Sequence, residues 1–136
     1  MLESPPKRLS AFTLSELLVV LVIVGILILL ALPVLMPLIS KTRSLEAKQA
    51  LKHLHSLQKT YFYEHARYTS NLTEMGFEID KLSTEGGKAN YRVEVVAASQ
   101  NDFVARATAV VDFDGDAQLN VWEIDHNQDL KEVTPD

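Results

Sequence analysis

One run of oxygen-bearing side chains near the C-terminus has the spacing of a calcium-binding loop. Asp112, Asp114, Asp116, Gln118 and Asn120 stand at every second position. Carboxylate and amide oxygens are the ligands that Ca²⁺ prefers, and the EF-hand loop takes its ligands from alternate positions of this kind. We therefore treat these five residues as candidate ligands of a Ca²⁺ ion.

The same run also has a simpler interpretation, as an acidic connection between two strands. The sixth place of a calcium loop requires glycine, whereas this chain has Ala117 there, and the flanking residues alternate as strands do. Asp114-Gly115 is a favourable pair for a β-turn. In that geometry Glu123, at the twelfth place, would not reach back to the aspartates. Ca²⁺ is the one cofactor for which the sequence offers ligands, and a plain acidic turn is the alternative.

The sequence offers no set of residues with the makeup of a catalytic centre. There is no cysteine, which excludes disulfides, thiolate catalysis and zinc–thiolate sites. His53 and His55 are two residues apart in a predicted helix, so they face different directions and make a poor metal pair. No nucleophile–base pair, phosphate-binding glycine loop or pair of catalytic carboxylates can be assembled. We predict that the chain is not an enzyme.

A single carboxylate, Glu16, stands at the start of a long apolar run. The next 23 residues, Leu17 to Ile39, carry no charge. At a rise of about 1.5 Å per residue, a helix of this length crosses the bilayer's hydrocarbon core, which is about 30 Å thick. A charge held in such surroundings is costly unless it is paired. The position of Glu16 therefore suggests a partner.

The basic residues ahead of the apolar run set its orientation. Lys7 and Arg8 precede it, so the positive-inside tendency places the N-terminus in the cytoplasm and residues 40–136 on the other side of the membrane. An ordinary secretory signal has an apolar core of only about 7–15 residues before its cleavage site. Here the run is longer and the helical pattern continues after it, which favours a membrane-spanning helix.

One long helix is predicted from about Phe12 to about His65. Its first half, residues 12–39, is apolar, and we expect a kink or loosened turn near Pro33–Pro37 because proline removes a helical hydrogen bond. Its second half, residues 40–65, is amphipathic. The apolar face of this half is formed by Ala47, Ala50, Leu51, Leu54, Leu57, Tyr61 and Phe62.

The remaining residues predict a loop over 66–88 and an antiparallel sheet over 89–136. Alternating apolar residues indicate strands at Tyr91–Val95, Phe103–Val110 and Leu119–Ile124, with a fourth at Leu130–Thr134. The apolar face of this sheet needs a cover, and the amphipathic half of the helix can supply it. The predicted fold class is α+β, a long N-terminal helix packed on a meander of three to four strands.

Charge is divided between the two parts that lie outside the apolar run. Residues 40–65 carry a net charge of +3, and residues 66–136 carry a net charge of −8. We call residues 66–136 the head. Its negative charge argues against duplex nucleic acid as a partner, because phosphate groups attract positive charge. The division also suggests that Lys48, Lys52 and Lys59 of one copy meet the acidic head of another.

The N-terminal residues resemble those of type IV pilins and related pseudopilins. The resemblance is carried by Ala11-Phe12-Thr13-Leu14-Ser15-Glu16-Leu17, followed by Gly25 and Pro33. In that family a prepilin peptidase removes a short basic leader, and the new N-terminal phenylalanine is methylated. The resemblance implies a leader over residues 1–11, a cut between Ala11 and Phe12, and methylation of Phe12. The family usually has glycine before the cut, and we expect the small side chain of Ala11 to be tolerated.

The resemblance implies a structural subunit that polymerises with itself into a type IV pilus-like filament. Glu16 would pair with the freed amine of a neighbouring Phe12, within an assembly helix that contains Gly25 and Pro33. The implied partners are prepilin peptidase and the assembly machinery, with its platform protein and ATPase. The precursor would lie in the inner membrane, and the product would be an extracellular filament or a periplasmic pseudopilus.

Two alternatives to a pilus subunit remain open at the level of sequence. One is a pseudopilin of type II secretion, since the N-terminal motif is shared by both. Looser similarity to bacterial pilins in Ala66–Gly76 and in the C-terminal hairpin favours the pilus. The other is a monomeric signal-anchored membrane protein that carries a small external domain, with or without Ca²⁺.

Overall fold

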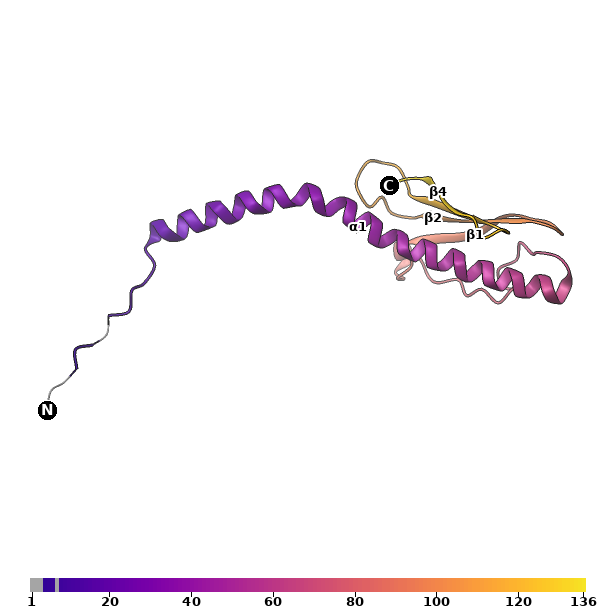
Figure 1. Cartoon of the computed structure of the whole chain (residues 1–136), viewed down its shortest axis with the longest axis horizontal. Coiled ribbons are helices and arrows are strands. Elements are labelled where there is room, and N and C mark those ends of the chain that lie inside the picture. Colours follow the sequence, from indigo (N-terminus) through magenta and orange to yellow (C-terminus); the bar gives the residue numbers. More distant parts are fainter. Residues whose placement is uncertain (1–3, 7) are drawn as a thin grey trace. The chain divides into compact units, whose positions relative to one another are not determined.

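The computed structural model describes residues 4–6 and 8–136. They fall into two compact units, which divide between Leu35 and Met36. In chain order the elements are helix α1 (Leu14–His65), the 3-10 helix η1 (Ser83–Glu85), and strands β1 (Tyr91–Ala98), β2 (Phe103–Ala109), β3 (Val121–Asp125) and β4 (Leu130–Thr134) (Figure 1).

Helix α1 begins two residues after the predicted position and ends where predicted. Its helical assignment continues through Pro33 and Pro37, so the loosened turn expected there does not interrupt the helix. The helix stops because Ala66 adopts a left-handed conformation with φ of 57°. The Ala66 N–H then donates to the Phe62 carbonyl at 2.7 Å, which satisfies an acceptor in the last turn.

The sheet is an antiparallel meander in the order β1-β2-β3-β4, which confirms the predicted α+β fold class and the fourth strand. Ala107 of β2 pairs with Val93 of β1 on one side and with Trp122 of β3 on the other. The period-two alternation fixes this register, because a slip by one residue would expose every core side chain. An irregularity between Val95 and Ala97 of β1 shifts the register near the β1–β2 turn.

The second half of α1 lies along one face of the sheet, and the core of the head forms between them (Figure 1). Strand β2 presents three alanines and Phe103 to this core, and each is at most 1% exposed. Small side chains in the central strand leave room for the larger side chains of the helix. The helix contributes Ala47, Leu51, Leu54 and Tyr61, and Ile124 of β3 joins them.

The loop after α1 is fixed to the helix by Gln58, which is fully buried. Its amide nitrogen donates to the Thr69 carbonyl at 2.5 Å, and its amide oxygen accepts the Thr69 N–H at 3.1 Å. The side chain of Asn71 caps the following turn, where its Oδ1 accepts the Thr73 N–H at 3.0 Å. That turn closes at Gly76, whose φ of 78° suits glycine.

Candidate assembly site

The start of α1 is closed by two reciprocal hydrogen bonds between Thr13 and Glu16. The Thr13 N–H donates to Glu16 Oε2 at 2.9 Å, and the Glu16 N–H donates to Thr13 Oγ1 at 3.3 Å. This capping box satisfies two N–H groups that have no partner within the helix, and the carboxylate lies at the positive end of the helix dipole. Glu16 therefore also has a local role, which the Thr-x-x-Glu spacing could have revealed.

The candidate cleavage bond lies just ahead of this cap. Residues 8–13 belong to no helix or strand, and Ala11 and Phe12 are both exposed. Exposed chain outside regular structure is the form in which a peptidase can bind a peptide bond. Arg8 lies in the same segment, whereas Lys7 and residues 1–3 of the predicted leader fall outside the described residues.

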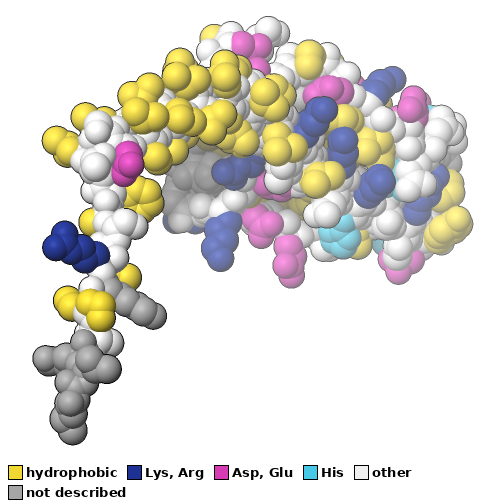
Figure 2. Space-filling model, turned by 60° about the vertical axis from the view of Figure 1, so that its left-hand side comes forward, with side chains coloured by type: hydrophobic (Ala, Val, Ile, Leu, Met, Phe, Trp, Pro, Cys, Tyr) yellow, Lys and Arg dark blue, Asp and Glu magenta, His cyan; other side chains and the backbone are white. Residues whose placement is uncertain are grey.

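The apolar half of α1 exposes its side chains on every side. All residues from Leu17 to Ile39 are exposed. Figure 2 shows hydrophobic side chains covering the visible face of this half of the helix. By length and composition, α1 is suited to cross a membrane. A helix that is apolar all round needs lipid or other helices around it. Gly25 and Pro33 are both exposed, and a Cβ atom at Gly25 would have no neighbouring atom within 4 Å. The roles of these two residues in assembly therefore stay predictions.

Basic side chains on the second half of α1 lie over aromatic rings of the head. The Lys48 Nζ lies 4.4 Å from the centre of the Trp122 ring. Lys59 lies 5.4 Å from the centre of the Tyr68 ring and donates to the Tyr68 hydroxyl at 2.9 Å. These cation–π contacts attach the helix to its own head. Two of the three lysines expected to meet a neighbouring copy thus have partners within the chain, and Lys52 is exposed.

The loop between β2 and β3 gathers three of the five candidate Ca²⁺ ligands. One carboxylate oxygen from each of Asp112, Asp114 and Asp116 lies within 4.8 Å of the others. Asp112 also accepts the N–H groups of Gly115 at 2.7 Å and Ala117 at 2.8 Å. The aspartates therefore fold the loop themselves, as the acidic-turn interpretation requires. Gln118 donates its backbone N–H to Asp116 Oδ1 at 2.7 Å.

The surroundings shift the pKa values of two carboxyl groups in this loop in opposite directions. Hydrogen bonds from Gly115 and Ala117 hold the pKa of Asp112 below its usual value. The Asp116 N–H lowers the pKa of Asp114, but partial desolvation and the carboxylates of Asp116, Asp136 and Asp112 raise it overall. The stabilisation from Asp112 is present above the ordinary pKa of aspartate and disappears as the pH falls through its lowered value.

Ca²⁺ binding by this loop stays a prediction, which calorimetry of the detergent-solubilised full chain can test. If the ion binds, Asp114→Asn should weaken its affinity by about tenfold or more, because a charged oxygen ligand is lost. Glu94→Gln, a substitution at an exposed position of β1, is the matched control and should leave the affinity unchanged. An absence of binding heat in the unmodified chain would establish the loop as a plain acidic turn.

Asn120, the fifth candidate ligand, is the centre of a different site. It is 1% exposed, and its Oδ1 accepts both the Tyr91 hydroxyl and the Trp122 Nε1–H at 2.7 Å. Its Nδ2 donates to Glu132 Oε1 at 2.7 Å and to the Thr134 carbonyl at 3.0 Å. Both lone pairs of the amide oxygen are used in this way. The structure therefore does not bring Asn120 to the aspartate cluster.

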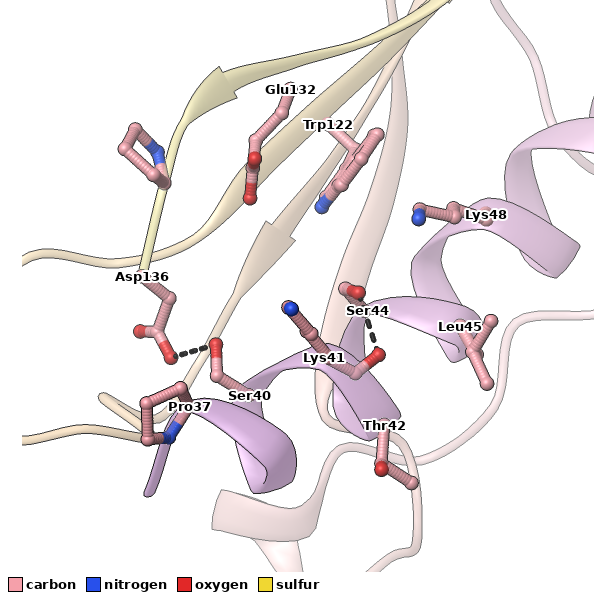
Figure 3. Close-up of a pocket in the computed structure, with 11 residues that line it drawn as sticks. Pro37, Ser40, Lys41, Thr42, Ser44, Leu45, Lys48, Trp122, Glu132 and Asp136 are labelled. Atoms are coloured by element: carbon pink, nitrogen blue, oxygen red, sulfur yellow. Dashed lines mark hydrogen bonds between the residues drawn. The ribbon is translucent and has the colours of Figure 1, made fainter. Parts of the chain in front are cut away.

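A cavity of about 540 Å³ opens beside this network, between α1 and the ends of β3 and β4 (Figure 3). Ser40 Oγ donates to Asp136 Oδ2 at 2.8 Å, and Ser44 Oγ donates to the Lys41 carbonyl at 2.8 Å. The cavity thus contains side chains of both charges, and the Ser40 hydroxyl joins α1 to the C-terminal residues, whereas the Ser44 hydroxyl bonds within α1. Its walls include Lys41, Ser44, Lys48, Trp122, Glu132 and Asp136.

The chain is similar to a known family at its N-terminus and to a known protein over a longer region. A family described as the prokaryotic N-terminal methylation motif matches residues 6–32. The type IV major pilin protein PilA of Myxococcus xanthus (strain DK1622) is 37% identical over 90 residues. The matched region covers 66% of this chain and 39% of that protein, so the chain spans well under half the length of this relative.

Proposed function

Because the chain belongs to the type IV pilin family, in the broad sense that includes the pseudopilins, we propose that it is the repeating structural subunit of a helical filament. The proposal extends to its processing, in which prepilin peptidase cuts between Ala11 and Phe12 and the new amine of Phe12 is methylated. Its role is structural rather than enzymatic. The precursor is anchored in the inner membrane, and a platform protein and an ATPase extract it for assembly.

One observation carries this proposal: an apolar helix exposed on every side begins with a single carboxylate. Outside lipid, the exposed residues Leu17 to Ile39 need other apolar surfaces, and a bundle of identical helices provides them. Each helix brings one Glu16 and, after cleavage, one amine at Phe12. The carboxylate and the amine of neighbouring copies can then neutralise one another in an environment where an isolated charge is costly.

The capping box is compatible with this pairing. Glu16 uses Oε2 for the Thr13 N–H, while an ionised carboxylate has two oxygens that can each accept hydrogen bonds. The same side chain can therefore close its own helix and bind a neighbour's amine through Oε1. The hydrogen bond to the Thr13 N–H also restrains the carboxylate before a neighbour arrives, which reduces the entropy lost when the pair forms.

Between the two kinds of filament, we favour a pilus over a pseudopilus of type II secretion. The support is the similarity to a major pilin, which extends over 66% of the chain and thus well beyond the N-terminal motif. A pilus subunit should appear in filaments sheared from the cell surface. Recovery of the protein only from the periplasm, with loss of protein secretion on its deletion, would instead identify the pseudopilin.

Mass spectrometry of the mature protein tests the proposed processing. We expect a mature chain that begins at Phe12 and carries one additional methyl group on its amine. An Ala11→Gly variant provides the matched control, since glycine is the usual family residue and should give the same mature N-terminus. An intact Met1 in protein purified from its native membrane would contradict the proposal and support a signal-anchored monomer.

A further inference from the structure

One face of α1 presents an exposed leucine among lysines. Lys41, Leu45, Lys48 and Lys52 follow one another at spacings of four, three and four residues, which places them on one side of the helix. Leu45 is 53% exposed, and the first three of these residues line the same cavity. Among the described residues, no salt bridge involves these lysines; Lys48 lies over the Trp122 ring of its own chain, and Lys41 and Lys52 are exposed. We call these four residues the basic stripe.

An apolar pocket with an acidic rim lies between α1, the loop after it and β1. Its volume is about 320 Å³, and apolar walls come from Ala50, Phe77, Leu82 and Val93. Ile79, at its edge, is 69% exposed. Four carboxylates and one guanidinium also line it. We call it the acidic pocket, and its charged residues are Glu46, Glu78, Asp80, Glu85 and Arg92.

The acidic side chains at the rim are largely available to another molecule. Glu78, Asp80 and Glu85 are exposed, and no salt bridge involves them in the part of the chain that the structure describes. Glu46 differs, because its carboxylate accepts both the backbone N–H of Asn90 at 2.7 Å and the Asn90 side-chain amide at 2.8 Å. The rim therefore presents unpaired negative charge around an apolar opening.

We propose that the acidic pocket receives the basic stripe of a second copy of this chain, with Leu45 inserted beside Ile79. The two surfaces match in both respects, since an apolar side chain among lysines meets an apolar opening among carboxylates. This inference rests on the proposed function, in which copies of the chain pack side by side. It adds a contact between heads to the pairing at Glu16.

The arrangement has the property that a filament requires. The stripe and the pocket are different surfaces of one chain, so the contact is heterologous and leaves one stripe and one pocket unused at the two ends of an open oligomer. Contacts of this kind continue into rings or open helical filaments. The two charges also repel incorrect pairings, because stripe against stripe or pocket against pocket places like charges together.

Cysteine cross-linking tests this contact in cells that assemble the filament. The chain has no native cysteine, so Leu45→Cys and Ile79→Cys introduce the only thiols. When the two single variants are expressed together, mild oxidation should give a dimer, which neither variant gives alone. The double variant should give a ladder of multimers. Leu45→Cys together with Gln100→Cys, an exposed residue of the β1–β2 turn, is the control and should give no ladder.

A charge exchange provides an independent measurement. Lys52→Glu should reduce the yield of sheared filaments by about two- to fivefold, in the range of an exposed ion pair, and the further substitution Asp80→Lys should restore it. If the cysteine variants form normal filaments but no cross-linked products, the contact is overturned and the proposed function stays intact. The same holds if Asp80→Lys fails to restore the yield that Lys52→Glu has lowered. Cross-links to a protein of another mass would also overturn the contact. Failure of the unmodified chain to polymerise would overturn both.

Discussion

A Glu16→Gln variant is expected to lose filament assembly while its head stays folded. Glutamine can close the capping box as glutamate does, so the start of α1 keeps its hydrogen bonds. The negative charge is lost, and the amine of a neighbouring Phe12 is left without a counter-ion among apolar helices. Breaking a buried ion pair on one side costs about 3–5 kcal/mol, which corresponds to about two to four orders of magnitude in the association constant.

Thr13→Val separates the two roles of Glu16. This substitution removes Thr13 Oγ1, which accepts a hydrogen bond of 3.3 Å from the Glu16 N–H, but leaves the carboxylate in place. Loss of an N-terminal cap costs about 1 kcal/mol, so the helix start should fray while filaments still form. Electron microscopy of sheared surface fractions measures assembly in both variants. Filaments of normal number with Glu16→Gln would show that the cap, and not the charge, is the essential contribution of this residue.

Asn120→Ala is expected to destabilise the head by about 3–5 kcal/mol, because several buried partners lose their hydrogen bonds together. The Tyr91 hydroxyl and the Trp122 Nε1–H both bond to the amide oxygen, at 2.7 Å. Burial, with the carboxylates of Asp136, Glu46 and Glu132, raises the pKa of Tyr91 far above its usual value, so the hydroxyl keeps its proton and still needs an acceptor. A loss of this size is a large fraction of the stability of a typical domain, which is about 5–15 kcal/mol.

Urea unfolding of the detergent-solubilised full chain measures this effect. Trp122 is the single tryptophan and lies inside the network, so its fluorescence reports on the head. The control is Gln118→Ala, which replaces another of the predicted Ca²⁺ ligands. Gln118 is exposed, and its substitution should change stability by no more than about 0.5 kcal/mol. Equal small effects from both substitutions would contradict a structural role for Asn120. Effects that appear only when Ca²⁺ is present would return Asn120 to the ligand set.

The loop from Asp112 to Asn120 shows how far spacing alone can mislead. Alternate positions of an extended chain point to the same side only while the chain stays regular, and here Gly115 and Ala117 have φ values of 85° and 68°. These turns bring three aspartates together. Asn120 lies just before β3, where the strand pairing directs its side chain into the core, and no local signal identifies Tyr91, 29 residues earlier, as its partner.

Gln58 is a different case, because its position was visible in the sequence. It lies one turn from both Leu54 and Tyr61, on the apolar face of the helix, and a polar residue there predicts a buried hydrogen-bond partner. That the partner is the backbone of Thr69 depends on the path of the loop. Likewise, the positive charge of residues 40–65 was visible in the sequence, but the contacts of Lys48 with Trp122 and of Lys59 with Tyr68 required the position of the sheet.

The sequence by itself determined the long helix, the four strands, the apolar face of the head and the N-terminal motif. Each of these depends on a local period or a contiguous pattern, which the backbone converts directly into structure. The tertiary structure alone decided which polar groups meet: it places Asn120 in the core network and Lys48 and Lys59 over aromatic rings. It also decided that the basic stripe and the acidic pocket are separate surfaces. Such contacts join residues distant in the chain, and their geometry follows from strand register and from the packing of α1 on the sheet.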